Sequence, residues 1–167
     1  IEIALRRLDV GDEVYVVTCE GELPSCTANP LKDKNICNRC IRIKNHILEN
    51  VLDGKITEVR IPNLINETDK TLDKINDNNV SSDYQFDSSK FARNQIVDLE
   101  KDSFVNNNHP LILSLSGAGN KYYDFISKFI KINEIKRAYI WNGRRTFEAA
   151  TIHGCIQNGV KFKTHIS

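Results

Sequence analysis

The chain has 167 residues, of which 40% are hydrophobic and 27% are charged, so it can bury one conventional hydrophobic core. Its formal net charge of +1 gives no global electrostatic reason to expect nucleic acid as a partner. No apolar run approaches the ~20 residues of a transmembrane helix, and no signal peptide opens the sequence. We therefore expect a cytoplasmic globular protein without a transmembrane segment.

The first residues have the pattern of an amphipathic helix. Ile1, Leu5 and Leu8 repeat at helical spacing, and Gly11 stands where a helix commonly ends. The sequence contains no methionine, even at position 1, and no capping residue precedes the helix. We therefore expect the chain to be a fragment of a longer protein.

Four cysteines follow an apolar run at residues 13–18 that predicts a strand. They are spaced C-x6-C-x10-C-x2-C, at Cys19, Cys26, Cys37 and Cys40. The C-x2-C half is typical of a turn that aims two sulfurs at one metal ion. Three interpretations stay open: a zinc or iron–sulfur site, reduced structural or redox-active thiols, and two disulfides. The fifth cysteine, Cys155, makes the number odd, which argues against a disulfide framework.

The middle of the chain changes in composition. Residues 41–52 predict a helix and residues 57–61 a short strand. Residues 63–108 are rich in Asn, Asp, Ser and Lys, which indicates a polar insertion that is helical or disordered. Within it, 69–75 and 88–104 have enough apolar positions to form helices.

The last third returns to regular patterning. The expected elements are one helix over 111–130, or two helices broken near Gly117 and Gly119, then a strand at 137–141, a helix at 144–157 and a strand at 160–165. The two glycines lack the preceding strand and the third glycine of a dinucleotide-binding loop. Alternation of strands and helices predicts an α/β fold, a Rossmann-like parallel sheet flanked by helices, as a single domain over 1–167.

A second candidate site lies where the strand at 137–141 ends. Asn142 and Gly143 form a turn signal, and Arg144 at the start of the next helix is suited to binding an anion. His165 ends the last strand, at the same edge of the expected sheet, and histidine can serve as a general base. The alternative is structural: an Asn-Gly turn with a solvated arginine.

Together these motifs resemble one family. The run Thr18-Cys-Glu-Gly-Glu-Leu-Pro-Ser-Cys26, the Cys37-Asn-Arg-Cys40 pair, Trp141-Asn-Gly-Arg144 and His165 occur in the order found in the amino-terminal domain of a group of bacterial surface and capsular polysaccharide glycosyltransferases. These enzymes have two Rossmann domains, the GT-B architecture. Ile166 stands where the family pattern has Glu after the histidine.

The resemblance implies a fold, a reaction and a location. The chain would lack the first strand of its domain and the whole second domain, which would bind most of the nucleotide-sugar donor. It would supply the acceptor side of an enzyme that transfers sugar to a surface glycan at the inner face of the membrane, with possible peripheral membrane association. Asn142, Gly143 and Arg144 would bind substrate and His165 would be the base, with Glu20 or Glu22 as alternatives. Alone, such a fragment would be inactive.

Two other functions compete with the glycosyltransferase. One is a non-enzymatic interaction module whose four cysteines hold zinc or an iron–sulfur cluster. The other is a thiol-redox protein that uses Cys37 and Cys40 at the start of a helix, where the helix dipole would lower a thiol pKa. No D-x-D triplet suggests a catalytic divalent metal in this chain.

Overall fold

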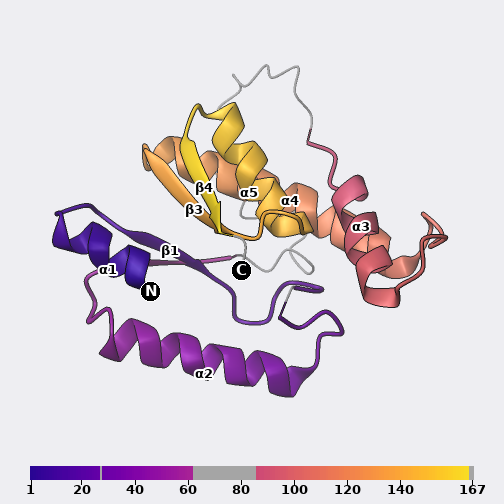
Figure 1. Cartoon of the computed structure of the whole chain (residues 1–167), viewed down its shortest axis with the longest axis horizontal. Helices are drawn as coiled ribbons and strands as arrows, with labels where there is room; N and C mark the ends of the chain where they lie inside the picture. The colour runs from indigo at the N-terminus through magenta and orange to yellow at the C-terminus, as the bar shows by residue number, and fades with distance from the viewer. Residues whose placement is uncertain (27, 62–85, 166–167) are drawn as a thin grey trace, which may run out of the picture. The chain divides into compact units, whose positions relative to one another are not determined.

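The computed structural model describes residues 1–26, 28–61 and 86–165 (Figure 1). In this part the chain forms five helices and two sheets, each of two parallel strands. The prediction of an α/β fold with parallel strands is therefore confirmed. The structure divides into two compact units, Ile1–Asn63 and Leu64–Ser167, which we call unit 1 and unit 2. The single Rossmann-like sheet, and with it the single domain, stays a prediction.

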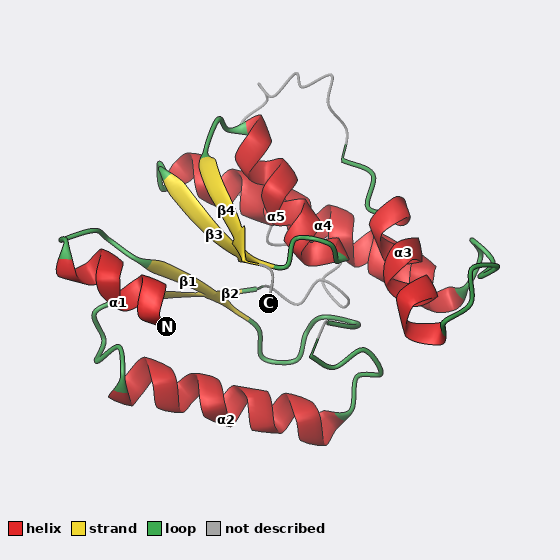
Figure 2. Ribbon diagram, viewed as in Figure 1, coloured by secondary structure: helices red, strands yellow, loops and turns green. Residues whose placement is uncertain are grey.

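Unit 1 is built around one strand–helix–strand crossover. Its elements are α1 (Glu2–Asp9), β1 (Tyr15–Thr18), α2 (Lys34–Asn50) and β2 (Thr57–Arg60). The two strands pair in parallel, with Tyr15 opposite Thr57 and Thr18 opposite Arg60. Parallel strands require a crossover connection, and α2 provides it. Figure 2 shows α2 beside the strand pair, joined to β1 by the loop that carries the first two cysteines.

The first helix ends as its sequence predicts. Gly11 adopts a φ of 85°, and its amide donates to the Leu8 carbonyl oxygen at 2.9 Å. A residue with a Cβ enters this left-handed region with difficulty, whereas glycine enters it freely. The turn at Gly11 separates α1 from β1.

Helix α2 begins seven residues before the predicted start at residue 41, at Lys34. The missed signal is Asp33, the N-cap residue, whose carboxylate accepts a hydrogen bond from the Asn35 amide at 2.7 Å. Cys37 and Cys40 therefore lie within the helix, three residues apart on neighbouring positions of one face, and not in a turn before it.

Unit 1 has a small apolar core. In the described residues, its buried apolar side chains are Leu52, Ile61 and Pro24, the last of which lies in the loop between Cys19 and Cys26. Helix α2 contributes no buried residue over its 17 positions. Hydrophobic burial alone therefore holds α2 weakly within this unit.

Unit 2 contains the second crossover. Its elements are α3 (Ser89–Glu100), α4 (Pro110–Ile132), β3 (Arg137–Trp141), α5 (Thr146–Gln157) and β4 (Lys161–His165). Strands β3 and β4 pair in parallel from Arg137 opposite Lys161 to Trp141 opposite His165. The predicted strands and the helix within 88–104 are confirmed, and the helix expected at 69–75 lies outside the described residues.

Helix α4 is continuous through Gly117 and Gly119, so the single helix is confirmed and the alternative of two helices is wrong. The reason for Gly119 is space: a Cβ there would lie 2.5 Å from Thr146 Cγ2 and 2.8 Å from Ser88 Cβ. Its absence lets α4 approach the start of α5 closely. Gly119 is therefore required for the packing of α4, whereas Gly117 faces open space.

The core of unit 2 is formed by helices α4 and α5. Eight residues of α4 and six of α5 are buried, Tyr122 and Phe147 among them, with their rings 5.5 Å apart at an edge-to-face angle of 86°. The phenolic oxygen of Tyr122 lies 3.3 Å from Thr151 Oγ1, and burial raises the pKa of this tyrosine to about 12. The strands β3 and β4 thus rest on a well-packed helical layer.

Helix α3 belongs to the predicted polar insertion, yet it fixes the start of α5. Gln95 is 2% exposed, and its side-chain oxygen accepts hydrogen bonds from the Thr146 amide at 3.3 Å and from Thr146 Oγ1 at 3.1 Å. The N-cap residue Arg145 makes no capping bond of its own. Gln95 therefore satisfies one of the free amides at the start of this helix.

Candidate functional sites

The four amino-terminal cysteines converge within unit 1. Each is a free thiol; Cys19, Cys26 and Cys37 are half-buried, and Cys40 is exposed. Cys26 and Cys40 lie near enough to Cys19, and Cys37 and Cys40 near enough to Cys26, for repulsion between thiolates to raise the pKa of Cys19 and Cys26. These interactions connect all four sulfurs, although they come from a loop and a helix.

Amide groups of the loop donate to the sulfurs. The Gly21 amide donates to the Cys19 sulfur, and the amides of Ala28 and Asn29 donate to that of Cys26. Asn29 Nδ2 lies 3.1 Å from the sulfur of Cys37. The backbone is thus folded so that its N–H groups point at the thiols.

Asn29 organises this loop. It is 3% exposed, its Nδ2 donates to the Asp33 carbonyl oxygen at 2.7 Å, and its Oδ1 accepts from the Asp33 amide at 2.9 Å. Because Asn29 contacts Cys26 through its amide and Cys37 through its side chain, it joins the loop sulfur to the helix sulfur.

Burial sets the protonation of two of the thiols. It raises the pKa of Cys19 and of Cys26, and the neighbouring cysteines raise both further, against amide hydrogen bonds that lower them. Without a bound cation, these groups are neutral thiols at pH 7. Within the parts of the chain that the structure describes, no three Cys, His, Asp or Glu side chains already surround one point as metal ligands do.

A group of charged residues holds α2 to the strands beside the cysteine loop. Lys44 Nζ donates to Glu58 Oε1 at 2.8 Å and also pairs with Glu20, the residue after Cys19. Thr18 Oγ1 donates to Glu58 Oε1 at 2.7 Å. Lys44 therefore connects the helix, the end of β1 and strand β2.

These contacts shift two pKa values. Hydrogen bonds from Lys44 and then from Thr18 lower the pKa of Glu58 to about 2. Burial lowers the pKa of Lys44, but its hydrogen bonds to Glu20 and Glu58 outweigh this effect and raise it. Both carboxylates named above as alternative bases are engaged. That of Glu20 pairs with Lys44, and Glu22 Oε2 accepts from the Glu20 amide at 2.5 Å.

In unit 2, the Asn-Gly turn is left-handed at both residues. Asn142 has a φ of 64° and Gly143 a φ of 77°. A Cβ on Gly143 would lie 2.8 Å from Ile152 Cδ1 and 3.1 Å from Thr164 Cγ2, so the turn packs closely on α5 and β4. The position of Gly143 thus requires glycine for both backbone conformation and space.

The two consecutive arginines after this turn have different surroundings. Arg145 Nη1 lies 3.3 Å from the Gln95 carbonyl oxygen and 3.6 Å from Asp98 Oδ2, and is thereby tied to α3. Arg144 is exposed and makes no hydrogen bond or ion pair with any other described residue. Of the two, Arg144 is the one available to a ligand.

The ends of β3 and β4 lie side by side at this turn. Trp141, the last residue of β3, is opposite His165, the last residue of β4, and the Trp141 side chain is 53% exposed. The structure thus brings Asn142, Gly143 and Arg144 to the carboxyl edge of a parallel pair that ends in His165, within unit 2.

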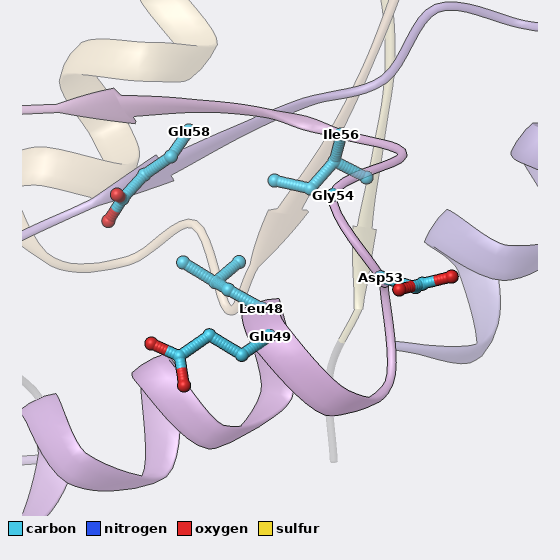
Figure 3. A pocket seen from close by; sticks show the side chains of 6 residues that line it. All are labelled: Leu48, Glu49, Asp53, Gly54, Ile56 and Glu58. Atoms are coloured by element: carbon cyan, nitrogen blue, oxygen red, sulfur yellow. The ribbon is translucent and has the colours of Figure 1, made fainter.

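An open hollow of about 450 Å³ lies between the end of α2 and β2 in unit 1. Figure 3 shows its lining, in which the carboxylates of Glu49, Asp53 and Glu58 point in different directions and do not converge. Glu58 is already engaged by Lys44 and Thr18. The hollow therefore has no arrangement of donors that suits an ion.

Comparisons with other proteins give no relative for this chain: no protein-family model matches it, and no curated protein or solved structure shows significant similarity. None of the helices in the described residues is both long and apolar enough to cross a membrane. The contacts above are therefore the basis for assigning a function.

Proposed function

We propose that this chain is the acceptor-side, amino-terminal part of a two-domain, GT-B-type glycosyltransferase. It would transfer sugar from a nucleotide-sugar donor to a surface polysaccharide glycan at the cytoplasmic face of the membrane. The observation that carries the proposal is the left-handed Asn142–Gly143 turn at the carboxyl ends of two parallel strands, followed by Arg144, which pairs with no described residue. Ligands of α/β proteins bind at this edge of the sheet.

In this proposal, each residue of the turn has a separate task. Asn142 and Gly143 present backbone and amide groups to the acceptor, and Arg144 binds an anionic group of the glycan or its carrier. His165, at the end of the neighbouring strand, accepts the proton of the attacking hydroxyl. The enzyme would have two Rossmann-like domains. The second, outside this chain, binds most of the donor.

The single tryptophan of the chain makes the turn directly testable. Trp141 adjoins Asn142, so a ligand that binds there changes its fluorescence. We expect a member of a panel of bacterial capsular oligosaccharides to give a saturable change. Arg144→Gln weakens that binding by about 10-fold to 100-fold, the range for loss of one charged hydrogen bond.

Arg145→Gln is the matched control, because it removes the same charge one residue away. Its side chain contacts α3, so the substitution lowers the stability of unit 2 and leaves the affinity within about 2-fold of wild type. Equal loss of affinity in both variants, or no saturable change with any oligosaccharide, would contradict the proposal.

A non-enzymatic metal-binding interaction module is the second candidate, favoured by the convergence of the four thiols in unit 1. A whole gene product that binds zinc but neither binds glycans nor transfers sugar would favour the module. The redox alternative has less support, because Cys37 is the fourth residue of α2 and two further thiols lie beside it. Disulfide-exchange activity lost in Cys37→Ser would favour the redox protein.

A further inference from the structure

We infer that Cys19, Cys26, Cys37 and Cys40 bind one zinc ion that fastens the loop after β1 to helix α2. The first observation is the convergence of the sulfurs around two residues. Gly21 donates its amide to the Cys19 sulfur, and a Cβ built on it would lie 3.9 Å from the sulfur of Cys37. Asn29 contacts the sulfurs of Cys26 and Cys37.

The fourth sulfur follows from helix geometry. Cys40 lies three residues after Cys37 in α2, so the two side chains are neighbours on one helical face. Gly21 and Asn29 bring the loop with Cys19 and Cys26 against Cys37, and therefore next to Cys40. Two sulfurs from the loop and two from the helix thus converge on the same region.

The surroundings are those of thiolate ligands. N–H groups stabilise sulfur that carries negative charge, and here both loop sulfurs and Cys37 accept such hydrogen bonds. A closed set of four thiolates with no open position is the donor set of structural zinc. Each thiol releases its proton as its sulfur binds the ion, and the ion draws the sulfurs into tetrahedral positions.

Unit 1 has a reason to need such a cross-link. Among the described residues, its buried apolar side chains are Leu52, Ile61 and Pro24, and α2 buries none. A metal that joins the loop to α2 supplies stability that so small a core does not provide. This site depends on neither candidate function, because a structural ion stabilises unit 1 whether or not the whole protein transfers sugar.

The test is metal analysis and cobalt substitution of protein purified under reducing, anaerobic conditions. We expect one zinc per chain by elemental analysis. Replacement of zinc by Co²⁺ should give the sulfur-to-cobalt charge-transfer band and the visible bands of a tetrahedral thiolate site. These measurements use the wild-type protein, so they do not depend on whether a cysteine variant folds.

Variants then assign the ligands. Cys26→Ser and Cys37→Ser should each weaken Zn²⁺ binding by more than about 100-fold, whereas Asn29→Ala, which removes a supporting hydrogen bond, weakens it by about 10-fold to 100-fold. The control is Cys155→Ala, a buried cysteine in unit 2, which should leave the stoichiometry and affinity unchanged.

Four outcomes would overturn the zinc site. They are wild-type protein without stoichiometric metal or a cobalt charge-transfer band, an iron–sulfur cluster in place of zinc, disulfides among the four cysteines when thiols are blocked at lysis, and equal loss of metal in Cys37→Ser and Cys155→Ala. A failure of glycan binding at Arg144 would leave the zinc result intact, so the two proposals fail separately.

Discussion

Lys44 is the residue through which α2 is held most strongly by charge to the rest of unit 1. Its ammonium group contacts Glu58 on β2 and Glu20 at the entry to the cysteine loop, and its side chain is only 12% exposed. A pair of this kind is screened less by solvent than a surface ion pair. Its loss should therefore be measurable.

The Glu58 carboxylate provides the measurement. Its pKa is lowered from 4.5 to about 2, so its share of stability is fully present above pH 4.5 and is lost as the pH falls through about 2. Lys44→Gln removes the hydrogen bond that lowers the pKa of Glu58 most, and we expect this pKa to rise toward 4.5. We also expect the free energy of unfolding at pH 7 to fall by about 1 to 2 kcal/mol.

Carbon-13 NMR of the Glu58 carboxyl group during an acid titration checks this expectation. Lys34→Gln is the control, since Lys34 is an exposed lysine on the same helix with the same charge. An unchanged Glu58 titration in Lys44→Gln, or an equal shift in both variants, would show that Lys44 does not hold this carboxylate.

At the residue scale, sequence patterns predicted donors better than their supporting contacts. The spacing of the cysteines predicts that their sulfurs bind one metal ion, because short sequence separations and a helical repeat restrict their positions, and this stays a prediction. Asn29 and Lys44 gave no such signal. Lys44 reaches Glu20 across 24 positions, and a contact between residues so far apart depends on how the loop folds.

Helices show which local signals were informative. The periodicity of apolar residues correctly predicted α1, α3 and α5. The predicted start of α2 at residue 41 was wrong. The apolar pattern begins only at Ile41, whereas the N-cap Asp33 begins the helix at Lys34. Capping chemistry, rather than periodicity, sets where that helix begins.

For helix α4, a break at the glycines was one of two predicted alternatives, because glycine has low helix propensity. The structure gives the two glycines opposite surroundings: Gly117 has no heavy atom within 4 Å of a built Cβ, while Gly119 lies against Thr146 and Ser88. Helix propensity therefore determines the effect of a side chain at Gly117, and tertiary packing determines it at Gly119.

This difference predicts opposite effects on stability from the same substitution in one helix. Gly117→Ala should raise the free energy of unfolding by about 0.5 to 1 kcal/mol, because alanine loses less backbone entropy. Gly119→Ala should lower it by about 1 to 3 kcal/mol, because the methyl group forces α4 away from Thr146 and Ser88.

Denaturant unfolding followed by Trp141 fluorescence reports on unit 2 and measures both changes. A loss of stability in Gly117→Ala, or a gain in Gly119→Ala, would contradict the packing described for α4. The two variants control for each other, since both add one methyl group to the same helix.

At the scale of the whole molecule, the described chain contains two parallel strand pairs, each joined by a helix. In unit 1 the loop after β1 carries two of the four thiols, and in unit 2 the turn after β3 carries Asn142, Gly143 and Arg144. Both features follow the carboxyl end of a parallel strand, where ligand sites of α/β proteins collect.

Alternation of strands and helices was sufficient to predict this α/β character. It did not predict the division into two compact units, because the boundary falls within the polar segment at 63–108, whose composition gives no sign of where one unit ends. The same segment contains α3, whose Gln95 holds the start of α5. Polar composition therefore did not distinguish a structural helix from a surface insertion.

The most direct test of the proposed glycosyltransferase function is sugar transfer by the whole gene product, measured with a panel of nucleotide sugars and a capsular oligosaccharide acceptor. We expect transfer from one donor class. We also expect kcat to be lower by about 10²-fold to 10⁴-fold in His165→Ala, the variant that lacks the proposed base. Absence of both glycan product and nucleotide release with every donor would contradict it, as would full activity in His165→Ala.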